Sequence, residues 1–264
     1  MKGQLPRWVD MGLIPLLNVT AAFLVSGLVV LFIGENPIQA VREMIFGSLG
    51  YREGFGFTLY YATNFIFTGL AVAVAFHAGL FNIGGEGQAY VAGLGVALVC
   101  LSVGEAFPWW ITFPVAILGA GAFGAAWALI PAWLQATRGS HIVITTIMFN
   151  FIAASLMVYL LVNVLKVPGS MEPTTARFAE GGTLPYLRDI IPVFGFSPAN
   201  ISIIWALICC VLVYVLIWRT RLGYEMRTFG FSQSAAIYAG ISPTKIIVVT
   251  MLISGGLAGM MARR

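Results

Sequence analysis

Long apolar stretches, separated by short polar connections, run along most of the chain. An α-helix of about 20 residues is roughly 30 Å long, which matches the hydrocarbon core of a bilayer. Stretches of that length with very few charges indicate membrane-spanning helices. The pattern therefore predicts an all-α, polytopic membrane helix bundle with about seven spans, at residues 13–33, 57–77, 88–104, 108–130, 142–165, 200–218 and 245–262.

The composition excludes an ordinary soluble domain. Hydrophobic residues make up 59% of the 264 residues and charged residues only 9%, and the mean hydropathy is +0.93. One soluble core cannot bury so much apolar surface, whereas a lipid bilayer can cover it. We expect residues 1–264 to form a single transmembrane domain. The net charge of +4 is small and spread over the connections, so it does not indicate a nucleic-acid partner.

Basic residues in the short connections predict the sidedness of the chain, because lysine and arginine are enriched in cytoplasmic loops. We expect a cytoplasmic N terminus, a cytoplasmic loop at about 219–244 and an external, proline-rich loop at about 166–199. The charges that favour this orientation are Lys2 and Arg7 before the first span, Arg138 between the fourth and fifth, and Arg219, Arg221 and Arg227 after the sixth.

Seven spans and a cytoplasmic N terminus would place Arg263 and Arg264 outside, where basic residues are disfavoured. Either one span is miscounted or the natural chain continues past residue 264. We expect the second, a truncation at the C-terminal end.

Small residues recur every four positions in several predicted spans. Such spacing lets two helix backbones approach closely in lipid, so we interpret it as a packing signal. The positions are Ala89, Gly93 and Ala97, Ala120 and Gly124, and Gly255 and Gly259.

Residues 79–88, Gly-Leu-Phe-Asn-Ile-Gly-Gly-Glu-Gly-Gln, place glycines and polar side chains between two predicted spans. Glycines and an acid at such a place favour a broken helix whose unwound backbone lies beside a polar path. The alternative is a short cytoplasmic turn in which Glu86 is solvated and the glycines serve the turn alone. The candidate path residues of this motif are Asn82, Gly84, Gly85, Glu86 and Gln88.

Thr146 and Asn150 are four residues apart in the fifth predicted span and share one helix face. An asparagine in hydrocarbon needs hydrogen-bond partners, which either a neighbouring helix or a solute on a polar path supplies. The sequence leaves both alternatives open.

His77, at the end of the second span, is interpreted as an interfacial side chain. The two histidines and three cysteines have no spacing that indicates a metal site or a catalytic group.

A second polar segment, residues 223–241, follows the arginines at the end of the sixth span. It contains a candidate short helix, for which Ser232 or Ser234 is the N-cap and Gly240 the terminating residue.

This short helix is expected to present a small, flat cytoplasmic surface at Ala235 and Ala236. A cytoplasmic partner that docks there suits the segment better than contact with the membrane surface, because the apolar face of the helix would be weak.

The two segments resemble the permease subunits of bacterial ATP-binding-cassette importers, in the branch for simple sugars and nucleosides that is related to ribose and branched-chain amino-acid permeases. A GLxNIGxEGQ-like motif of that branch is matched almost completely by residues 79–88, and a TIMxN-like stretch by residues 145–150. The coupling loop of the branch reads approximately GxxxRxxGxNPxAAxxxGI. The residues that fit it are Gly223, Arg227, Gly230, Ala235, Ala236, Gly240 and Ile241, whereas residues 231–234, Phe-Ser-Gln-Ser, depart from it where Asn-Pro is usual.

The resemblance implies a transport subunit, not an enzyme, that translocates a nucleoside or simple sugar across the bacterial inner membrane. It implies that the chain binds no cofactor and that a separate cytoplasmic subunit uses ATP. In agreement, the chain contains no Gly-Lys dipeptide and hence no GxxxxGK phosphate loop. Further implied partners are a second permease subunit, homologous or identical, and an extracytoplasmic solute-binding protein. The candidate substrate path comprises Asn82, Gly84, Gly85, Glu86, Gln88, Thr146 and Asn150, and residues 223–241 form the coupling segment.

Two other classes compete with this interpretation. A secondary transporter driven by an ion gradient would need no ATPase and would leave the coupling segment without a role. An intramembrane enzyme would need a nucleophile and base, or paired acids, at depth, and Glu86 is the one acid that the sequence places near the membrane interior. The choice between nucleoside and sugar rests on the resemblance alone.

Overall fold

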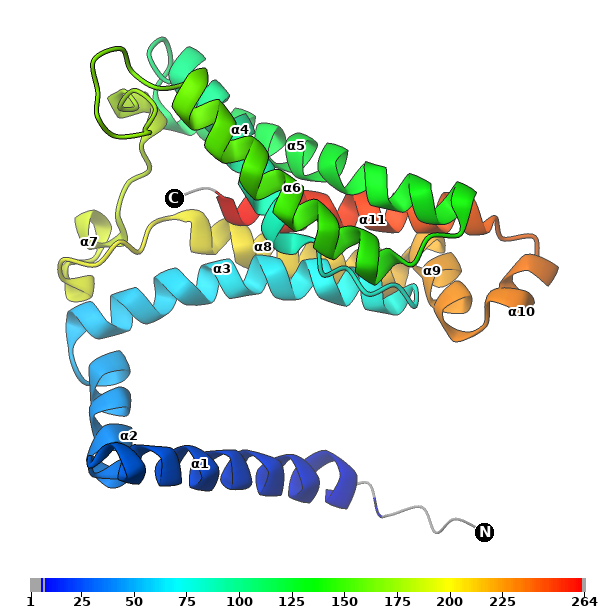
Figure 1. Ribbon diagram of the computed structural model, residues 1–264, viewed down its shortest axis with the longest axis horizontal. Helices are drawn as coiled ribbons and strands as arrows, with labels where there is room; N and C mark the ends of the chain where they lie inside the picture. The colour runs from blue at the N-terminus through cyan, green and yellow to red at the C-terminus, as the bar shows by residue number, and fades with distance from the viewer. Residues whose placement is uncertain (1–5, 7, 263–264) are drawn as a thin grey trace.

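The computed structural model describes residue 6 and residues 8–262, and it is a bundle of α-helices (Figure 1). Lys2, Arg7, Arg263 and Arg264, on which part of the predicted sidedness depends, lie outside the described residues. Within them no strand forms, and Tyr186 and Asn200 make an isolated antiparallel bridge. The helices are α1 (Ile14–Ile33), α2 (Pro37–Ile45), α3 (Arg52–His77), α4 (Gly85–Ser102), α5 (Trp109–Arg138), α6 (Ile142–Asn163), α7 (Leu187–Ile190), α8 (Ser202–Arg219), α9 (Arg221–Phe231), α10 (Gln233–Tyr238) and α11 (Pro243–Gly259).

The predicted fold class is confirmed, and six helical segments of the described residues are long and apolar enough to cross a membrane. The predicted span at 88–104 is not among them. It forms α4, whose first four residues are Gly-Glu-Gly-Gln. The apolar remainder of α4 covers roughly 20 Å at 1.5 Å per residue, which is shorter than the hydrocarbon core. The six segments are Val9–Ile33, Arg52–His77, Trp109–Arg138, Ile142–Asn163, Ser202–Arg219 and Pro243–Ala262.

Segments that the sequence predicts on opposite sides of the membrane lie at opposite ends of the bundle (Figure 1). α9 and α10, drawn in orange, lie at the end where α5 finishes, whereas α2 and α7 lie at the other end. The loop at 166–199 is irregular, as predicted, and contains the one-turn helices Glu180–Gly182 and Pro192–Phe194 besides α7. The long helices therefore run between two polar ends.

α5 and α11 pack with their backbones in contact, which confirms the packing signal in those two helices. A Cβ atom on Gly124 would collide with the carbonyl oxygen of Gly255, and a Cβ atom on Gly255 would lie 2.7 Å from the carbonyl oxygen of Gly124. A Cβ atom on Gly259 would lie 2.5 Å from the carbonyl oxygen of Ala120. Only residues without side chains allow this approach.

In α4 the glycine that packs closely is Gly95, two positions after the predicted Gly93. A Cβ atom on Gly93 would have no heavy atom nearer than 4.0 Å, so that glycine is not needed for packing. A Cβ atom on Gly95 would lie 2.9 Å from the carbonyl oxygen of Gly119 in α5. The spacing of small residues therefore identified the helix that packs closely but not the face.

The fourth predicted span, 108–130, is longer in the structure because α5 continues through Pro131 to Arg138. A proline inside a helix removes one backbone donor, and neighbouring helices in a membrane bundle compensate for that loss. Pro131 is buried, and α5 ends before Gly139, whose φ of 67° is left-handed.

α1 and α2 form an N-terminal arm that stands apart from the bundle (Figure 1). No residue of α1 is buried. Gly34, with a φ of 94°, ends α1, and the side chain of Asn36 caps α2 by accepting the backbone N–H of Ile38 at 2.9 Å. The sharp corner between the two helices thus follows from local sequence.

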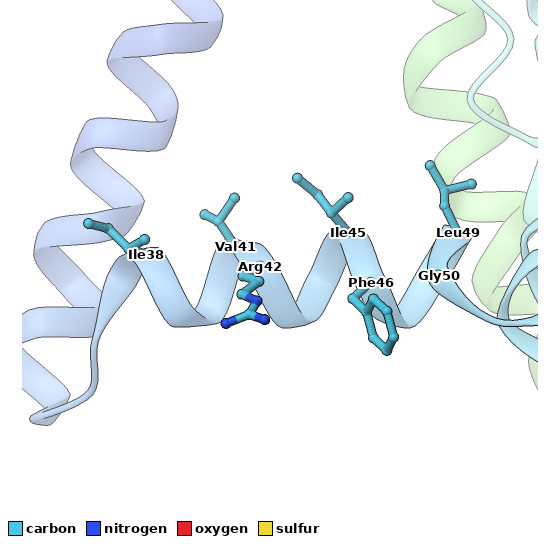
Figure 2. Close-up of a pocket in the computed structure, with 7 residues that line it drawn as sticks. All are labelled: Ile38, Val41, Arg42, Ile45, Phe46, Leu49 and Gly50. Carbon is cyan, nitrogen blue, oxygen red and sulfur yellow. The ribbon is translucent and has the colours of Figure 1, made fainter.

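α2 is amphipathic. Figure 2 shows Val41, Ile45 and Leu49 pointing to the side toward which α1 and the bundle extend, whereas Arg42 and Phe46 point away. These residues, with Ile38 and Gly50, line an open groove of about 530 Å³. Such a helix suits a membrane surface, with its apolar side toward the acyl chains and its charge toward water.

Candidate functional site

α3 ends in a tight turn that sends the chain back toward the bundle. Gly79 adopts a left-handed φ of 68°, and its N–H donates to the carbonyl oxygen of Phe76 at 2.9 Å. The N–H of Leu80 donates to the carbonyl oxygen of Ala75 at 3.0 Å. This pair of bonds closes a helix when glycine takes the left-handed conformation. Leu80 is 2% exposed, so the turn packs against the bundle.

Asn82 is the centre of a buried hydrogen-bond network. Its Nδ2 donates to Gln88 Oε1 at 3.0 Å and to Ser254 Oγ at 2.8 Å. Its Oδ1 accepts the backbone N–H of Gly84 at 2.9 Å and Nε2 of Gln88 at 3.1 Å. These four bonds use the two donors and both acceptor positions of the amide. Asn82, Gln88 and Ser254 are 4%, 1% and 0% exposed, so the network is closed to solvent.

The network joins four parts of the chain. Ser254, in α11, also donates to the carbonyl oxygen of Ala71 in α3 at 2.7 Å. Asn82 and Gln88 add the segment after α3 and the first turn of α4. The polar side chains predicted beside a path therefore bond one another and hold the ends of the broken helix in place.

Asn150 reaches the same segment from α6. Its Oδ1 accepts the backbone N–H of Gly87 at 2.9 Å, and its Nδ2 donates to the carbonyl oxygen of Ile83 at 2.9 Å. The first backbone N–H groups of a helix have no partner within the helix, and the N-cap residue Gly84 has no side chain to supply one. Asn150 thus makes the interhelical bonds that one of the two sequence interpretations required.

Thr146 lies against the start of α4 without bonding to it. Its hydroxyl donates to the carbonyl oxygen of Ile142 in its own helix at 2.8 Å, and its side chain is fully buried. A Cβ atom on Gly84 would lie 3.1 Å from Cβ of Thr146, and one on Gly87 would lie 3.0 Å from Cα of Asn150. Gly84 and Gly87 are therefore needed for close packing, whereas the nearest atom to a Cβ on Gly85 is 4.0 Å away.

Glu86 is the exception among the predicted path residues, because it faces outward. It is exposed, and within the part of the chain that the structure describes it makes no hydrogen bond or ion pair. Tyr90, one turn further along α4, shares its face and is 44% exposed. Sequence reasoning missed Tyr90, although its spacing of four from Glu86 would have identified it. These two polar side chains of the region are exposed in the single chain.

The coupling segment forms two helices, α9 and α10, instead of one. Ser232 is the N-cap of α10, accepting the backbone N–H of Ala235 at 3.3 Å. After α10, Gly240 takes a φ of 79°, and the N–H of Ile241 donates to the carbonyl oxygen of Ala236 at 2.9 Å. The predicted cap and terminating glycine are confirmed. α9, which precedes them, was not predicted.

The predicted surface on α10 is wrong for Ala236. This alanine is fully buried in the core, whereas Ala235 is exposed. Consecutive residues in a helix are about 100° apart, so a short helix resting on the bundle turns one inward and the other outward. The exposed surface of this region is instead apolar and large, since Phe231, Ile237 and Tyr238 are 91%, 56% and 97% exposed.

α9 folds back against the ends of α8 and α3. Thr220 caps it by accepting the backbone N–H of Gly223 at 3.1 Å, and a Cβ on Gly223 would collide with carbonyl oxygens of α8. The guanidinium of Arg227 lies 4.6 Å from the ring centroid of Trp218, whose ring meets that of His77 edge-on at 5.8 Å. Arg227 and Gly223 therefore hold the corner between helices, and His77 packs against Trp218 at the end of α3.

An ion-pair group ties α9 to α11. Glu225 accepts Nε of Arg221 at 3.0 Å and lies 3.8 Å from Nζ of Lys245. The Glu225 side chain is 14% exposed, whereas those of Arg221 and Lys245 are 92% and 62% exposed. Such exposed partners contribute little to stability.

Comparisons with known proteins all lead to permease components of transport systems. Residues 54–262 match the family described as branched-chain amino acid transport system / permease component. The chain is 37% identical over 252 residues to the guanosine ABC transporter permease of Bacillus subtilis, covering 94% of this chain and 70% of that protein. It is 33% identical over 259 residues to the glucose ABC transporter permease of Haloferax volcanii, covering 97% and 67%. It is 30% identical over 250 residues to the nucleoside ABC transporter permease of Lactococcus lactis, covering 94% and 68%. No solved structure gives a significant match.

Proposed function

The chain belongs to the family of branched-chain amino acid transport system permease components, and we propose that the solute it carries is a nucleoside. As a permease subunit of an ATP-binding-cassette importer, it is a multi-pass membrane protein and not a catalyst. The observation that carries the proposal is the likeness to permeases named for guanosine and for nucleosides. A simple sugar is the second candidate, because a relative of similar identity is named for glucose.

The energy in this proposal comes from ATP hydrolysed by a separate cytoplasmic subunit that docks on α10. The exposed apolar side chains of Phe231, Ile237 and Tyr238 support this role, because large exposed apolar patches mark interaction surfaces. The lack of a Gly-Lys dipeptide also supports it, since this chain then has no GxxxxGK loop for ATP phosphates. A second permease subunit and an extracytoplasmic solute-binding protein complete the proposed importer.

The solute path in this proposal runs along the face of α4 that carries Glu86 and Tyr90. Both are exposed in the single chain, and an acid and a phenol suit the hydroxyl groups and base of a nucleoside. Asn82 and Asn150 act indirectly, because their hydrogen bonds hold α4 in position. Of the other members, Gly84, Gln88 and Thr146 pack or bond at the start of α4, and Gly85 lies beside them with open space around it.

The proposed orientation keeps the N terminus in the cytoplasm of a bacterial inner-membrane protein. Its support is that the short connections at the end that holds α9 and α10 carry basic residues, whereas the basic residues of the other end lie on α2, at the start of α3 and in the long loop at 166–199. Arg138, Arg219, Arg221, Arg227 and Lys245 all lie at helix ends or in α9 there (Figure 1). Basic residues near helix ends mark the cytoplasmic side.

Reconstitution tests this proposal. The permease is purified with the ATPase, second permease and binding protein of the proposed importer and placed in liposomes. We expect uptake of labelled guanosine that requires ATP, persists with a protonophore and resists excess glucose. Uptake that the protonophore abolishes without ATP dependence would instead assign an ion-driven transporter, and competition by glucose alone would assign a sugar.

A further inference from the structure

The two segments singled out by the sequence touch each other through bare backbone. Gly230, in α9, lies against the turn that ends α3. A Cβ atom on Gly230 would collide with the carbonyl oxygen of His77, and it would lie 2.9 Å from the amide nitrogen of Gly79 and 3.0 Å from the carbonyl carbon of Ala78. In the reverse direction, a Cβ atom on Gly79 would lie 3.2 Å from Cα of Gly230. No side chain separates α9 from the turn here.

The atoms on both sides of this contact are held in place. The N–H of Gly79 is bonded to Phe76, and that of Leu80 to Ala75, so the turn moves as one piece with the end of α3. On the α9 side, Met226 and Phe229 are 0% and 1% exposed. Backbone atoms cannot rotate out of the way as the end of a flexible side chain can. A displacement of α9 at this point is therefore passed to the turn instead of being absorbed.

The turn leads directly into the buried network. Asn82 follows Gly79 by three residues, and its bonds to Gln88 and Ser254 connect the turn with α4 and α11. The chain between Gly79 and Asn82 is short and is held in the core by the buried Leu80. A shift of Gly79 therefore changes the position of the first turn of α4, which carries Glu86.

We propose that the contact between Gly230 and the Gly79 turn is the joint through which α9 and α10 move the 79–88 motif, and that Gly230 is a positioning residue for transport. This inference rests on the function proposed above, because it needs an ATPase that acts on α10. It adds a direct route from the coupling segment to the start of α4, in addition to the ion-pair group that connects α9 with α11.

The variant Gly230→Ala tests the joint in the complete reconstituted importer. The measurement is the amount of solute taken up per ATP hydrolysed. We expect the ATPase to co-purify and to hydrolyse ATP as before, while uptake per ATP falls about tenfold, within the range by which changes along a coupling route act. The matched control is Gly69→Ala in α3, where a Cβ atom has no heavy atom within 4 Å. It should keep the unsubstituted ratio.

An unchanged ratio in Gly230→Ala would overturn the joint. Loss of ATPase co-purification would overturn it too, because Gly230 would then act on docking and not on transmission. Absence of ATP-dependent uptake by the unsubstituted complex would overturn the proposed function and the joint together. These outcomes are distinguishable because docking, hydrolysis and uptake are measured separately.

A second measurement leaves Gly230 intact and so does not depend on the folding of the variant. Phe81 lies between the joint and Asn82 and is 43% exposed. In a background without the native cysteines, Phe81→Cys is labelled with a thiol reagent in the nucleotide-free importer and in the importer trapped with ATP. We expect the labelling rate to differ between the two states. A rate that does not depend on nucleotide would contradict the joint.

Discussion

The 79–88 motif and the coupling segment differ in the direction in which they turn their side chains. The motif turns amide side chains inward, where Asn82 forms hydrogen bonds with Gln88 and with Ser254. The coupling segment turns aromatic side chains outward, with Phe231 and Tyr238 91% and 97% exposed. The motif is therefore complete within this chain, apart from Glu86, whereas the coupling segment presents exposed apolar surface, which in our proposal the ATPase subunit covers.

Among variants that test this comparison, we expect the largest loss of stability from Ala236→Glu. Ala236 is the inward-facing residue of α10 and is fully buried, so the variant places an unpaired charge in the core. We expect a loss of about 3 kcal/mol or more of stability. The measurement is thermal unfolding of the detergent-purified chain. The control Ala235→Glu, on the exposed side, should change stability by less than about 0.5 kcal/mol. Equal stability of both variants would mean that α10 does not rest on the bundle.

Asn82→Ala should be the next largest change. It removes four hydrogen bonds and leaves Gln88 and the N–H of Gly84 without partners in a buried site. We expect a loss of about 2–3 kcal/mol in thermal unfolding. Asn163→Ala is the matched control, because Asn163 is exposed and bonds only within its own helix, at Tyr159. A stable Asn82→Ala protein with low uptake would show that this amide faces the solute instead.

Tyr238→Ala tests the outward-facing side of the comparison. An exposed aromatic side chain that becomes buried in an interface contributes about 2 kcal/mol, or roughly 30-fold in affinity. We expect that loss in the binding of the ATPase subunit, measured by titration of the purified complex, with unchanged thermal unfolding. Tyr159→Ala, 59% exposed on α6, should bind the ATPase normally. Normal binding by Tyr238→Ala would place the docking surface elsewhere.

Glu86→Gln should have the smallest effect of the four. The side chain is exposed and has no partner within the described residues, so stability should stay within roughly 0.5 kcal/mol. We expect uptake by the reconstituted importer to fall about tenfold, since the proposed path places this carboxylate beside the solute. Full uptake by the variant would reduce Glu86 to a surface residue and leave Tyr90 as the accessible polar group of the motif.

The sequence predicted what depends on local patterns. Apolar length placed the long helices, Ser232 and Gly240 marked the ends of α10, and the spacing of Gly255 and Gly259 indicated close packing. Each of these features involves residues of one continuous helix or of the turns at its ends. The physical rules that govern them, the hydrocarbon thickness and the capping of helix ends, likewise act within one segment of the chain.

What the sequence did not predict depends on pairing between distant residues. Asn82 bonds Ser254, 172 residues away, and Asn150 bonds Gly87, 63 residues away. A polar residue in an apolar span shows that a partner is needed but not which helix supplies it. The orientation of α10 was missed for the same reason, because Ala236 is turned inward by the core that receives it and not by its neighbours in sequence.

The buried network has a consequence for the order in which the chain is built. A newly made span such as α1 satisfies its own backbone and shows lipid mostly apolar side chains, so it can enter the bilayer as soon as it leaves the ribosome. The first turn of α4 cannot be completed in that way, because its partners come later, Asn150 in α6 and Ser254 in α11. The 79–88 motif is therefore synthesised early, but its hydrogen-bond network is completed late, when the insertion of α11 brings the hydroxyl of Ser254 to Asn82.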